Sequence, residues 1–425
     1  MVGVPDTRGI IRMKRRLLAA TSAVALATTM AACGSASDSS GGEGEGGTIK
    51  VALIPPTSGA LAQFGTDAVK GWETAVRLVN EDGGIDGREV ELVVKSTDAD
   101  PATTLRVARE AVTQDGAQYI GAVMTSPEHA ALNAQLEGLG AMSFNSLGKD
   151  DALIGEQCSP YAVHVVQSSS MDINGLANSL DELPGEKWAI QAVDYATGHS
   201  AAEKFRDAAE AAGKEIVLEQ FAPLNTTDFG SYITKIKSSG ADAVFAVEYG
   251  ADGVAFVQQA DQFNLDKQLE TVLGFNMVSE PLFETLGDTI VGYYNNVGYD
   301  VAGDNESNQE FVEAYTADHS EAPYYVPADN YLAAQTLFAA IEEAGSADPA
   351  DVSEAIADLS LDSIVGEVTV RAEDHQVLRD SYLGQVAEGD GGLAFDVLSN
   401  STPDVTTPSP ARTAPSESST VRAAP

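Results

Sequence analysis

The residues of this sequence that could hold a ligand are hydroxyl, amide and aromatic side chains placed just after apolar runs. Thr57-Ser58-Gly59 follows the run Ile49–Ile54, and Thr125-Ser126 follows the run Tyr119–Val123. If these runs are parallel strands, their carboxyl ends open on one crevice, where hydrogen-bonding groups beside an apolar wall suit a small polar molecule. The candidates placed in this way are Phe64, Thr125, Ser126, the segment Ser146–Lys149, Tyr195, Thr197, Tyr249 and Asn276.

The sequence offers little for catalysis or for metal binding. Its five histidines are neither spaced as His-x-x-x-His nor paired with cysteine, so no metal site is expected. It contains no Gly-x-Ser-x-Gly elbow and no phosphate-binding P-loop. Asp374 stands next to His375, but adjacent side chains tend to diverge, so we predict a structural or surface role for the pair. No catalytic residue, no metal ion and no cofactor is predicted.

The stretch Ile49–Arg88 predicts the elements that place the first candidates. Ile49–Ile54 has the length and branching of a buried strand, and Pro55-Pro56 after it bars a helix. Thr66 is expected to cap a helix with one apolar face, and Gly83-Gly84 to end that helix. The amide groups at the start of such a helix favour an anionic or polar ligand.

The alternation of strands and helices occurs twice along the chain, which predicts the α/β class with two doubly wound lobes joined near residues 165–175. Later elements are too few for a third domain and are expected to complete the two lobes. The predicted strands are 89–95, 119–123 and 141–144 in the first half, and 188–193, 215–218, 243–247 and 270–274 in the second half. The later elements are helices near 328–344 and 351–359 and strands near 366–371 and 382–387.

Length and charge limit the classes of function. A chain of 425 residues favours two domains, and 24 basic against 64 acidic residues give a net charge of −40. That charge disfavours nucleic acid and anionic lipid surfaces as partners, and it leaves open whether a salty habitat or simple solubility is the cause. No apolar run reaches 18 residues, so no transmembrane helix is expected. Cys158 is predicted to be a buried structural thiol, with a reactive thiol as the alternative.

The amino terminus has the features of an export signal. Lys14-Arg15-Arg16 precedes the apolar stretch Leu17–Met30, and Met30-Ala31-Ala32-Cys33 resembles a bacterial lipobox, with Met in place of the commoner Leu. We therefore predict a lipoprotein signal peptide over residues 1–32, lipidation of Cys33, and a flexible tether over residues 33–47. Simple secretion, a start at Met13, and export by the Sec or the twin-arginine route stay open.

Several dispersed motifs resemble the branched-chain amino-acid (Leu/Ile/Val-type) family of ABC-transporter substrate-binding proteins, which have the type I periplasmic-binding-protein fold. The motifs are PxSGxxAxxG at 56–65, NEDGGIDGR at 80–88, the turn 98–101, Asp194-Tyr195 with Gly198, TDF at 227–229, KIKSSGADAV at 235–244 and RAEDHQ at 371–376. The resemblance covers roughly residues 48–390 and implies two lobes joined by a three-crossover hinge that closes on a solute. It implies a first lobe of residues 48–170 and 299–375 and a second lobe of residues 171–298 and 376–397. The Pro/Ser/Thr-rich residues 398–425 are predicted to be a disordered tail.

The resemblance also implies roles for single residues. Thr125 and Ser126 match the position that helps to hold a solute carboxylate, and Leu147 and Lys149 fall in the loop after the fourth strand, where Lys149 replaces the usual Ser or Thr. Asp172 lies at the first crossover, where relatives place an acid near the site, and Tyr249 matches a pocket tyrosine. Phe64 and Thr197 replace positions that often carry tyrosine.

Asn276 is the sharpest departure, because leucine-type binders carry there the glutamate that pairs with the α-ammonium group. An amide cannot neutralise a desolvated ammonium. A neutral amide, a carboxylate without an amine or another small polar solute therefore fits at least as well as a standard α-amino acid, and Lys149, if it points inward, favours an anion.

These patterns predict an extracytoplasmic solute-binding lipoprotein of an ABC importer. Its expected partners are a small solute, an ABC permease with a cytoplasmic ATPase and the cell membrane, which it reaches through the lipid anchor. It is expected to be a monomer, to bind no nucleic acid and to catalyse nothing. The alternative is a ligand-sensing receptor domain that signals to a membrane partner.

Overall fold

The computed structural model describes residues 47–389 and 392–410. The predicted signal peptide, the lipidation site at Cys33 and all but the last residue of the predicted tether lie outside the described residues, as do residues 411–425 of the predicted tail.

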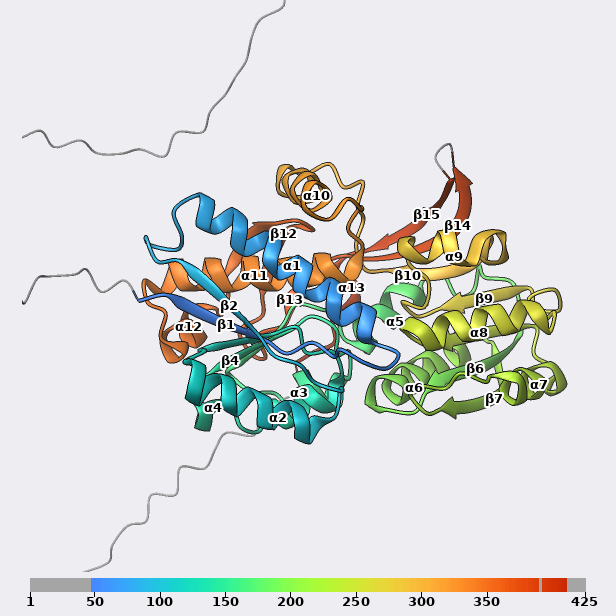
Figure 1. Cartoon of the computed structure of the whole chain (residues 1–425). Coiled ribbons are helices and arrows are strands. Elements are labelled where there is room, and N and C mark those ends of the chain that lie inside the picture. Colours follow the sequence, from blue (N-terminus) through green and yellow to red (C-terminus); the bar gives the residue numbers. More distant parts are fainter. Residues whose placement is uncertain (1–46, 390–391, 411–425) are drawn as a thin grey trace, which may run out of the picture. The chain divides into compact units, whose positions relative to one another are not determined.

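In the first lobe, the described residues form a five-stranded parallel sheet with the order β2-β1-β3-β4-β5. Alternate residues of β1 face opposite helical layers: Val51 and Leu53 pack with the α1 and α11 side, and Ile54, just past the strand, packs with the α2 and α4 side (Figure 1). The strands are β1 (Ile49–Leu53), β2 (Val90–Val94), β3 (Tyr119–Gly121), β4 (Met142–Asn145) and β5 (Ala162–His164). The helices are α1 (Ala62–Glu81), α2 (Pro101–Glu110), α3 (Ser126–Asn133), α4 (Leu136–Leu139) and α11 (Tyr325–Ala344).

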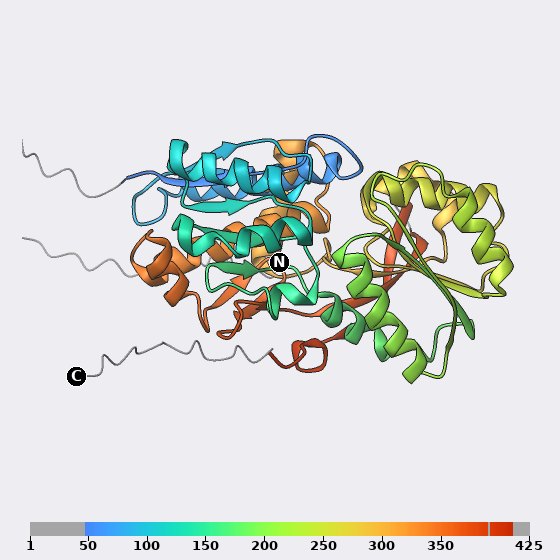
Figure 2. The same cartoon turned by 90° about the horizontal axis from the view of Figure 1, so that it is seen from below.

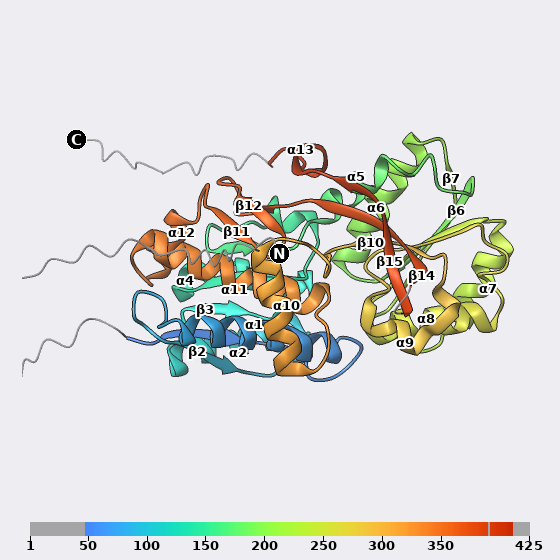
Figure 3. The same ribbon diagram turned by 90° about the horizontal axis from the view of Figure 1, so that it is seen from above.

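In the second lobe, the described residues form a seven-stranded sheet with the order β15-β14-β10-β9-β8-β6-β7. β6 to β10 run parallel, and β14 and β15 add an antiparallel hairpin beside β10, which Figure 3 shows. The strands are β6 (Lys187–Val193), β7 (Glu215–Ala222), β8 (Ala243–Val247), β9 (Thr271–Gly274), β10 (Tyr294–Val297), β14 (Ser381–Gly389) and β15 (Gly392–Ser401). The helices are α5 (Ser169–Ala177), α6 (Ala196–Ala211), α7 (Gly230–Ser239), α8 (Gly250–Gln262) and α9 (Phe283–Leu286).

The chain passes between the lobes three times: between β5 and α5, between β10 and α10, and between β13 and β14. Each lobe is therefore discontinuous in sequence, and Figure 2 shows the late, orange part of the chain among the early, blue-to-teal part. The remaining elements are α10 (Glu306–His319), α12 (Pro349–Ala355), α13 (Pro403–Thr406) and the strands β11 (Ser360–Ser363), β12 (Gly366–Val370) and β13 (Val377–Leu378). The predicted lobe boundaries lie near these crossings, although β13 pairs with β12 and so places the third crossing after Leu378 instead of after residue 375.

The prediction that the chain is disordered from residue 398 is wrong for residues 398–410. β15 continues to Ser401 because it pairs along β14, and α13 packs against α5. Asn174 donates a hydrogen bond through Nδ2 to the Thr406 carbonyl at 2.8 Å, and Arg371 donates through Nη1 to the Pro408 carbonyl at 2.7 Å. Tertiary contacts thus order a segment whose composition alone is typical of disorder.

Local predictions differ from the structure at a few further places. α1 begins at Ala62 with Leu61 as its N-cap, so Thr66 lies inside the helix, where its hydroxyl donates to the Ala62 carbonyl at 3.2 Å. Cys158 is half-buried instead of buried, and burial raises the pKa of its thiol. The elements not predicted are β5, β10, β11, β13, β15, α5, α9, α10 and α13. Short strands and short or weakly amphipathic helices give little periodic signal, and the end of β15 falls in the segment read as a tail.

Asp374 forms a two-pronged ion pair with Arg371, at 2.9 and 2.6 Å, and it does not contact the ring of His375 through any hydrogen bond in the described part of the chain. This geometry agrees with a structural role for Asp374, and the role of His375 stays a prediction. Within the described residues, no helix is long and apolar enough to cross a membrane, and no group of three or more His, Cys, Asp or Glu side chains could hold a metal ion.

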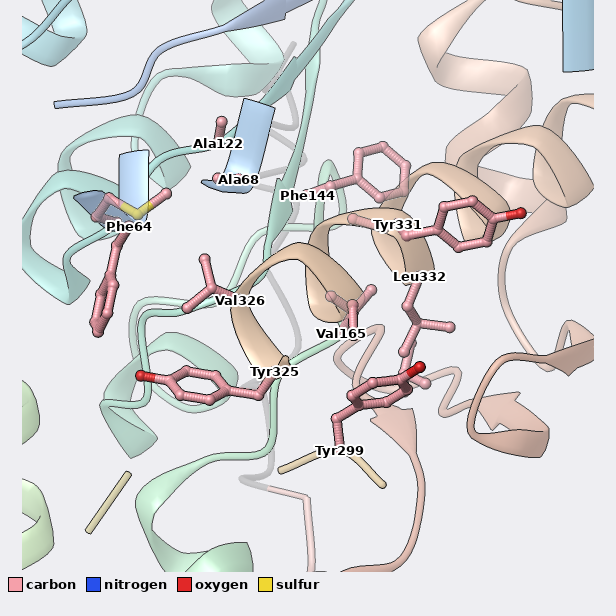
Figure 4. Close-up of a cluster of buried hydrophobic side chains, with 14 of the residues drawn as sticks. Phe64, Ala68, Ala122, Phe144, Val165, Tyr299, Tyr325, Val326, Tyr331 and Leu332 are labelled. Carbon is pink, nitrogen blue, oxygen red and sulfur yellow. The ribbon is translucent and has the colours of Figure 1, made fainter. Parts of the chain in front are cut away.

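The close approach of α1 to α11 positions two aromatic rings of the first lobe. Gly71 of α1 lies against Pro327 of α11, and the Trp72 indole donates to Asn330 Oδ1 at 3.1 Å. One end of this contact carries Phe64 and Tyr325, whose ring centroids are 6.0 Å apart (Figure 4). A Cβ at position 71 would lie 2.3 Å from the Pro327 carbonyl oxygen, so glycine is needed for this packing.

We predict that Gly71→Ala destabilises the protein by about 1–3 kcal/mol, because the added methyl group forces α1 and α11 apart. Gly138→Ala is the control: Gly138 is exposed, a Cβ there meets no atom within 4 Å, and alanine is the better helix former. Urea unfolding measures the stability of both variants. Equal midpoints for Gly71→Ala and the wild type would show that the helices can separate without cost.

Candidate functional site

A small enclosed cavity lies between the two lobes, at the carboxyl ends of their strands. Its volume is about 20 Å³, enough for about one water molecule, so a larger solute needs the lobes to open or side chains to move. The first lobe lines it with Leu61, Phe64, Met124, Ser146, Leu147, Lys149 and Tyr325, the first crossover with Val166, and the second lobe with Tyr195, Tyr249 and Asn276.

Larger hollows exist elsewhere in the described residues, including one of about 430 Å³ beside the carboxyl ends of β1 and β2, but that hollow lies within one lobe. One of about 600 Å³ is lined by Glu270, Tyr293 and Tyr294, at the opposite, amino-terminal ends of β9 and β10. Another of about 580 Å³ lies against β15. Ligands of open α/β sheets bind at the carboxyl ends of the strands, so we take the small cavity as the candidate site.

Six of the ten predicted ligand-binding residues line the cavity: Phe64, Leu147, Lys149, Tyr195, Tyr249 and Asn276. The structure brings them together because they follow the strands β4, β6, β8 and β9 or begin α1. The other four, Thr125, Ser126, Asp172 and Thr197, are buried beside the cavity but do not line it.

Thr125 belongs to the cap of α3. Its backbone N–H and its hydroxyl both donate to Glu128 Oε2, at 2.9 and 2.7 Å. The Thr125-Ser126-Pro127-Glu128 sequence is a capping box, so a signal for this role was present in the sequence. The hydroxyl of Thr125 is therefore committed to the helix, and its predicted contact with a solute carboxylate finds no support in this geometry.

Ser126 and Thr197 hold the two lobes together. Their hydroxyl oxygens are 2.6 Å apart, and Ser126 Oγ also accepts the backbone N–H of Asp150 at 3.1 Å. On another side of the cavity, Asn225 Oδ1 accepts the backbone N–H of Ala60 at 2.7 Å, and the Ala251 N–H donates to the Ala60 carbonyl at 3.2 Å. These hydrogen bonds join the two lobes on either side of the cavity.

Lys149 and Asp172 form a buried ion pair across the cleft, with Nζ and Oδ2 2.5 Å apart and side-chain exposures of 6 and 3%. Burial raises the pKa of the Asp172 carboxyl, and Lys149 opposes that shift. A second buried pair, Arg379 with Asp329 at 2.6 Å, interacts electrostatically with the first. The two cations and two anions leave the cluster without net charge, and this lowers the free-energy cost of burying it.

Three polar side chains that line the cavity have unused donors. The Tyr249 hydroxyl has no partner within the described residues, and the Lys149 ammonium group donates there only to Asp172. Asn276 Oδ1 accepts from Asn296 Nδ2 at 2.9 Å, which leaves the Asn276 amide nitrogen available. No carboxylate is among the described residues that line the cavity. The site therefore favours a solute that accepts hydrogen bonds.

Sequence reasoning missed five lining residues: Leu61, Met124, Ser146, Val166 and Tyr325. Met124 and Ser146 directly precede the candidates Thr125 and Leu147, so their positions after strands were visible, but an apolar residue there gives no chemical signal. Tyr325 reaches the cavity from the start of α11, which lies far along the sequence from the other lining residues, and only the fold places it there.

Glu248 lies directly behind the cavity tyrosines of the second lobe and is fully buried. Its Oε1 accepts Gln191 Nε2 at 2.7 Å, whereas Oε2 and Gln191 Oε1 have no partner within the described residues. Burial raises the pKa of Glu248 to about 8. Because the folded protein holds this proton more tightly than the unfolded chain, the stabilisation is complete at acidic pH and is lost as the pH rises toward 8.

We predict that Glu248→Gln removes this pH dependence, because glutamine cannot ionise and its amide can donate to Gln191 Oε1. The difference in unfolding free energy between the variant and the wild type should grow by about 1.4 kcal/mol per pH unit between about pH 5 and pH 8. Chemical denaturation across that range measures it. Glu137→Gln, at an exposed position, should show no such trend, and a flat difference for Glu248→Gln would mean that Glu248 is ionised throughout.

Comparison with known proteins identifies the family of the chain. A family model described as periplasmic binding protein matches residues 48–392. The chain is 29% identical over 366 residues to the Leu/Ile/Val-binding protein homolog 8 of Brucella abortus (strain 2308), covering 83% of this chain and 87% of that protein.

Solved structures of solute-binding proteins also align with most of the chain. A solute-binding protein of an ABC transporter from R. palustris, in complex with 4-hydroxybenzoate, aligns with a TM-score of 0.78 at 25% identity, covering 84% of this chain and 97% of that one. An ABC transporter substrate-binding protein from Sphaerobacter thermophilus aligns with a TM-score of 0.75 at 25% identity, covering 84% and 99%. The predicted family and fold are confirmed. The chain belongs to the periplasmic binding protein family and is an extracytoplasmic solute-binding protein of an ABC transporter.

Proposed function

We propose that the solute is a small carboxylate without an ammonium group, most simply an aromatic acid, which the protein delivers to its permease without any chemical change. The observation that carries this proposal is the donor-rich lining: Lys149, Tyr249 and Asn276 offer N–H or O–H groups, and no lining residue within the described part of the chain offers a carboxylate. A carboxylate has the acceptor capacity that these donors need. An α-ammonium group would find no anionic partner, and burying it unpaired is costly.

The apolar part of the lining supports an aromatic solute. The rings of Phe64, Tyr195, Tyr249 and Tyr325 surround the cavity, and aromatic side chains stack on flat solutes or meet them edge-on. The similar protein from R. palustris holds 4-hydroxybenzoate, which combines a flat ring with a carboxylate.

Lys149 can serve a solute carboxylate and Asp172 together. An ammonium group has three donors, and Asp172 occupies one of them in this structure. A second carboxylate beside Lys149 gives the cluster a net charge of −1, and Arg379, whose Nε and Nη2 have no partner within the described residues, lies close to it.

The anchor is part of the same proposal. The lipobox-like sequence Met30–Cys33 supports acylation of Cys33, which would hold a monomer at the outer face of the cell membrane with the cleft free to meet solute. The residues concerned lie outside the described part of the chain.

We predict that Tyr249→Phe weakens the binding of 4-hydroxybenzoate about tenfold or more, because it removes one donor to a charged acceptor. Stability should change little, since this hydroxyl has no partner in the described protein. Tyr293→Phe is a matched control: its hydroxyl is also buried and unpartnered, but Tyr293 lies away from the cavity. Isothermal titration calorimetry on the mature protein measures the affinities.

The same titrations compare 4-hydroxybenzoate and benzoate with leucine. Binding of leucine in preference to both aromatic acids would overturn the proposed solute class. Unchanged affinity in Tyr249→Phe would remove this hydroxyl from the site.

A further inference from the structure

Asn296 does not line the cavity, but it is hydrogen-bonded to Asn276, which does. It lies on β10, is 3% exposed, and faces the loop that follows β9. Its Oδ1 accepts the backbone N–H of Asn276 at 2.7 Å, and its Nδ2 donates to Asn276 Oδ1 at 2.9 Å. It also lies close enough to Asp172, the partner of Lys149, to oppose the rise in the pKa of that carboxyl. One amide thus lies beside two groups of the site.

These bonds fix which end of the Asn276 amide is available to a solute. A backbone N–H is always a donor, so the atom of Asn296 that meets it must be the amide oxygen. The other end of the Asn296 amide is then its NH₂ group, which requires an acceptor and takes Asn276 Oδ1. Asn276 is left with its own NH₂ group as the free polar end of a side chain that lines the cavity.

The backbone holds Asn276 in the conformation that this contact needs. Asn276 has a φ of 49°, in the left-handed region that asparagine tolerates better than most residues. The Asn276 amide nitrogen lies beside Gly298, just past β10, where a Cβ would be in ordinary van der Waals contact with it at 3.5 Å.

We propose that Asn296 is a positioning residue that determines the class of solute, by turning the donor end of Asn276 toward the cavity. This inference rests on the proposed function, since a donor at this position selects a carboxylate over an ammonium group. If the amide oxygen of Asn276 faced the cavity instead, the site would select an ammonium group over a carboxylate. The selectivity of the site therefore depends on a residue that does not line the cavity.

The neighbouring Asn295 offers a matched control. It also holds the loop after β9: its Oδ1 accepts the Met277 and Val278 N–H groups at 3.2 and 3.4 Å, and its Nδ2 donates to the Val278 carbonyl at 3.1 Å. It forms no hydrogen bond with the side chain of Asn276 within the described residues. A substitution at Asn295 therefore perturbs the loop without reversing the Asn276 amide.

The test compares Asn296→Asp with Asn295→Asp, using benzoate and benzylamine as probes that share a ring and differ in charge. An aspartate at position 296 still accepts the Asn276 N–H but cannot donate to Asn276 Oδ1, so the Asn276 amide should reverse. We expect the ratio of benzoate to benzylamine affinity to fall by on the order of a hundredfold in Asn296→Asp and by less than about threefold in Asn295→Asp.

A cycle with Asn276→Ala separates reorientation from the added negative charge. If Asn296 acts through the Asn276 amide, Asn296→Asp should not change the affinity ratio further in the Asn276→Ala background. An equal fall in both backgrounds would overturn the proposal in favour of a simple charge effect, as would an unchanged ratio in Asn296→Asp. A wild-type protein that binds neither aromatic acid would instead overturn the proposed function itself. Thermal melting of each variant shows whether it is folded.

Discussion

The buried ion pair between Lys149 and Asp172 is the interaction on which the closed site depends. Removing either charge alone from water would cost several kcal/mol. The cost of burying both is lower because the two groups contact each other directly and lie beside Arg379 and Asp329. Lys149 follows β4 of the first lobe, and Asp172 lies in the first turn of α5, which packs in the second lobe. The pair therefore joins the two lobes beside the first crossover.

The neutrality of this cluster constrains what the cavity can accept. With Lys149 already neutralised by Asp172, the site does not simply attract any anion. Under the proposed function, its preference comes from the direction of the remaining N–H and O–H groups on Lys149, Tyr249 and Asn276. Hydrogen-bond polarity, set by buried neighbours, can discriminate strongly because an unmatched polar group inside a closed cavity has no water to compensate it.

Local patterns in the sequence predicted much of the fold but only part of the candidate site. The apolar runs after which candidates were sought are strands, and residues that directly follow them, such as Tyr249 and Asn276, line the cavity. Thr125 shows the limit of this reasoning, because a hydroxyl after a strand can serve a helix cap as well as a ligand. Tyr325 shows another limit: it reaches the site only because α11 packs on α1, a contact that no local pattern encodes. Residues 398–410 became ordered for the same reason, through pairing with distant segments.

The crossovers explain how the cleft can open without unfolding. Gln376 donates through Nε2 to the carbonyls of His164 and Val166, at 3.0 Å each, and Gln167 donates to the Arg379 carbonyl at 3.2 Å, so the first and third crossovers are bonded to each other. The Lys149 loop is tied to the same region, since its carbonyl accepts the Ser169 N–H at 2.7 Å. The ion pair therefore lies beside the crossovers, whereas the Ser126–Thr197 and Ala60–Asn225 hydrogen bonds join segments of the two lobes that contain no crossover. Because hydrogen bonds of this kind contribute only about 1 kcal/mol each, opening the cleft at those contacts costs far less than breaking the buried charges.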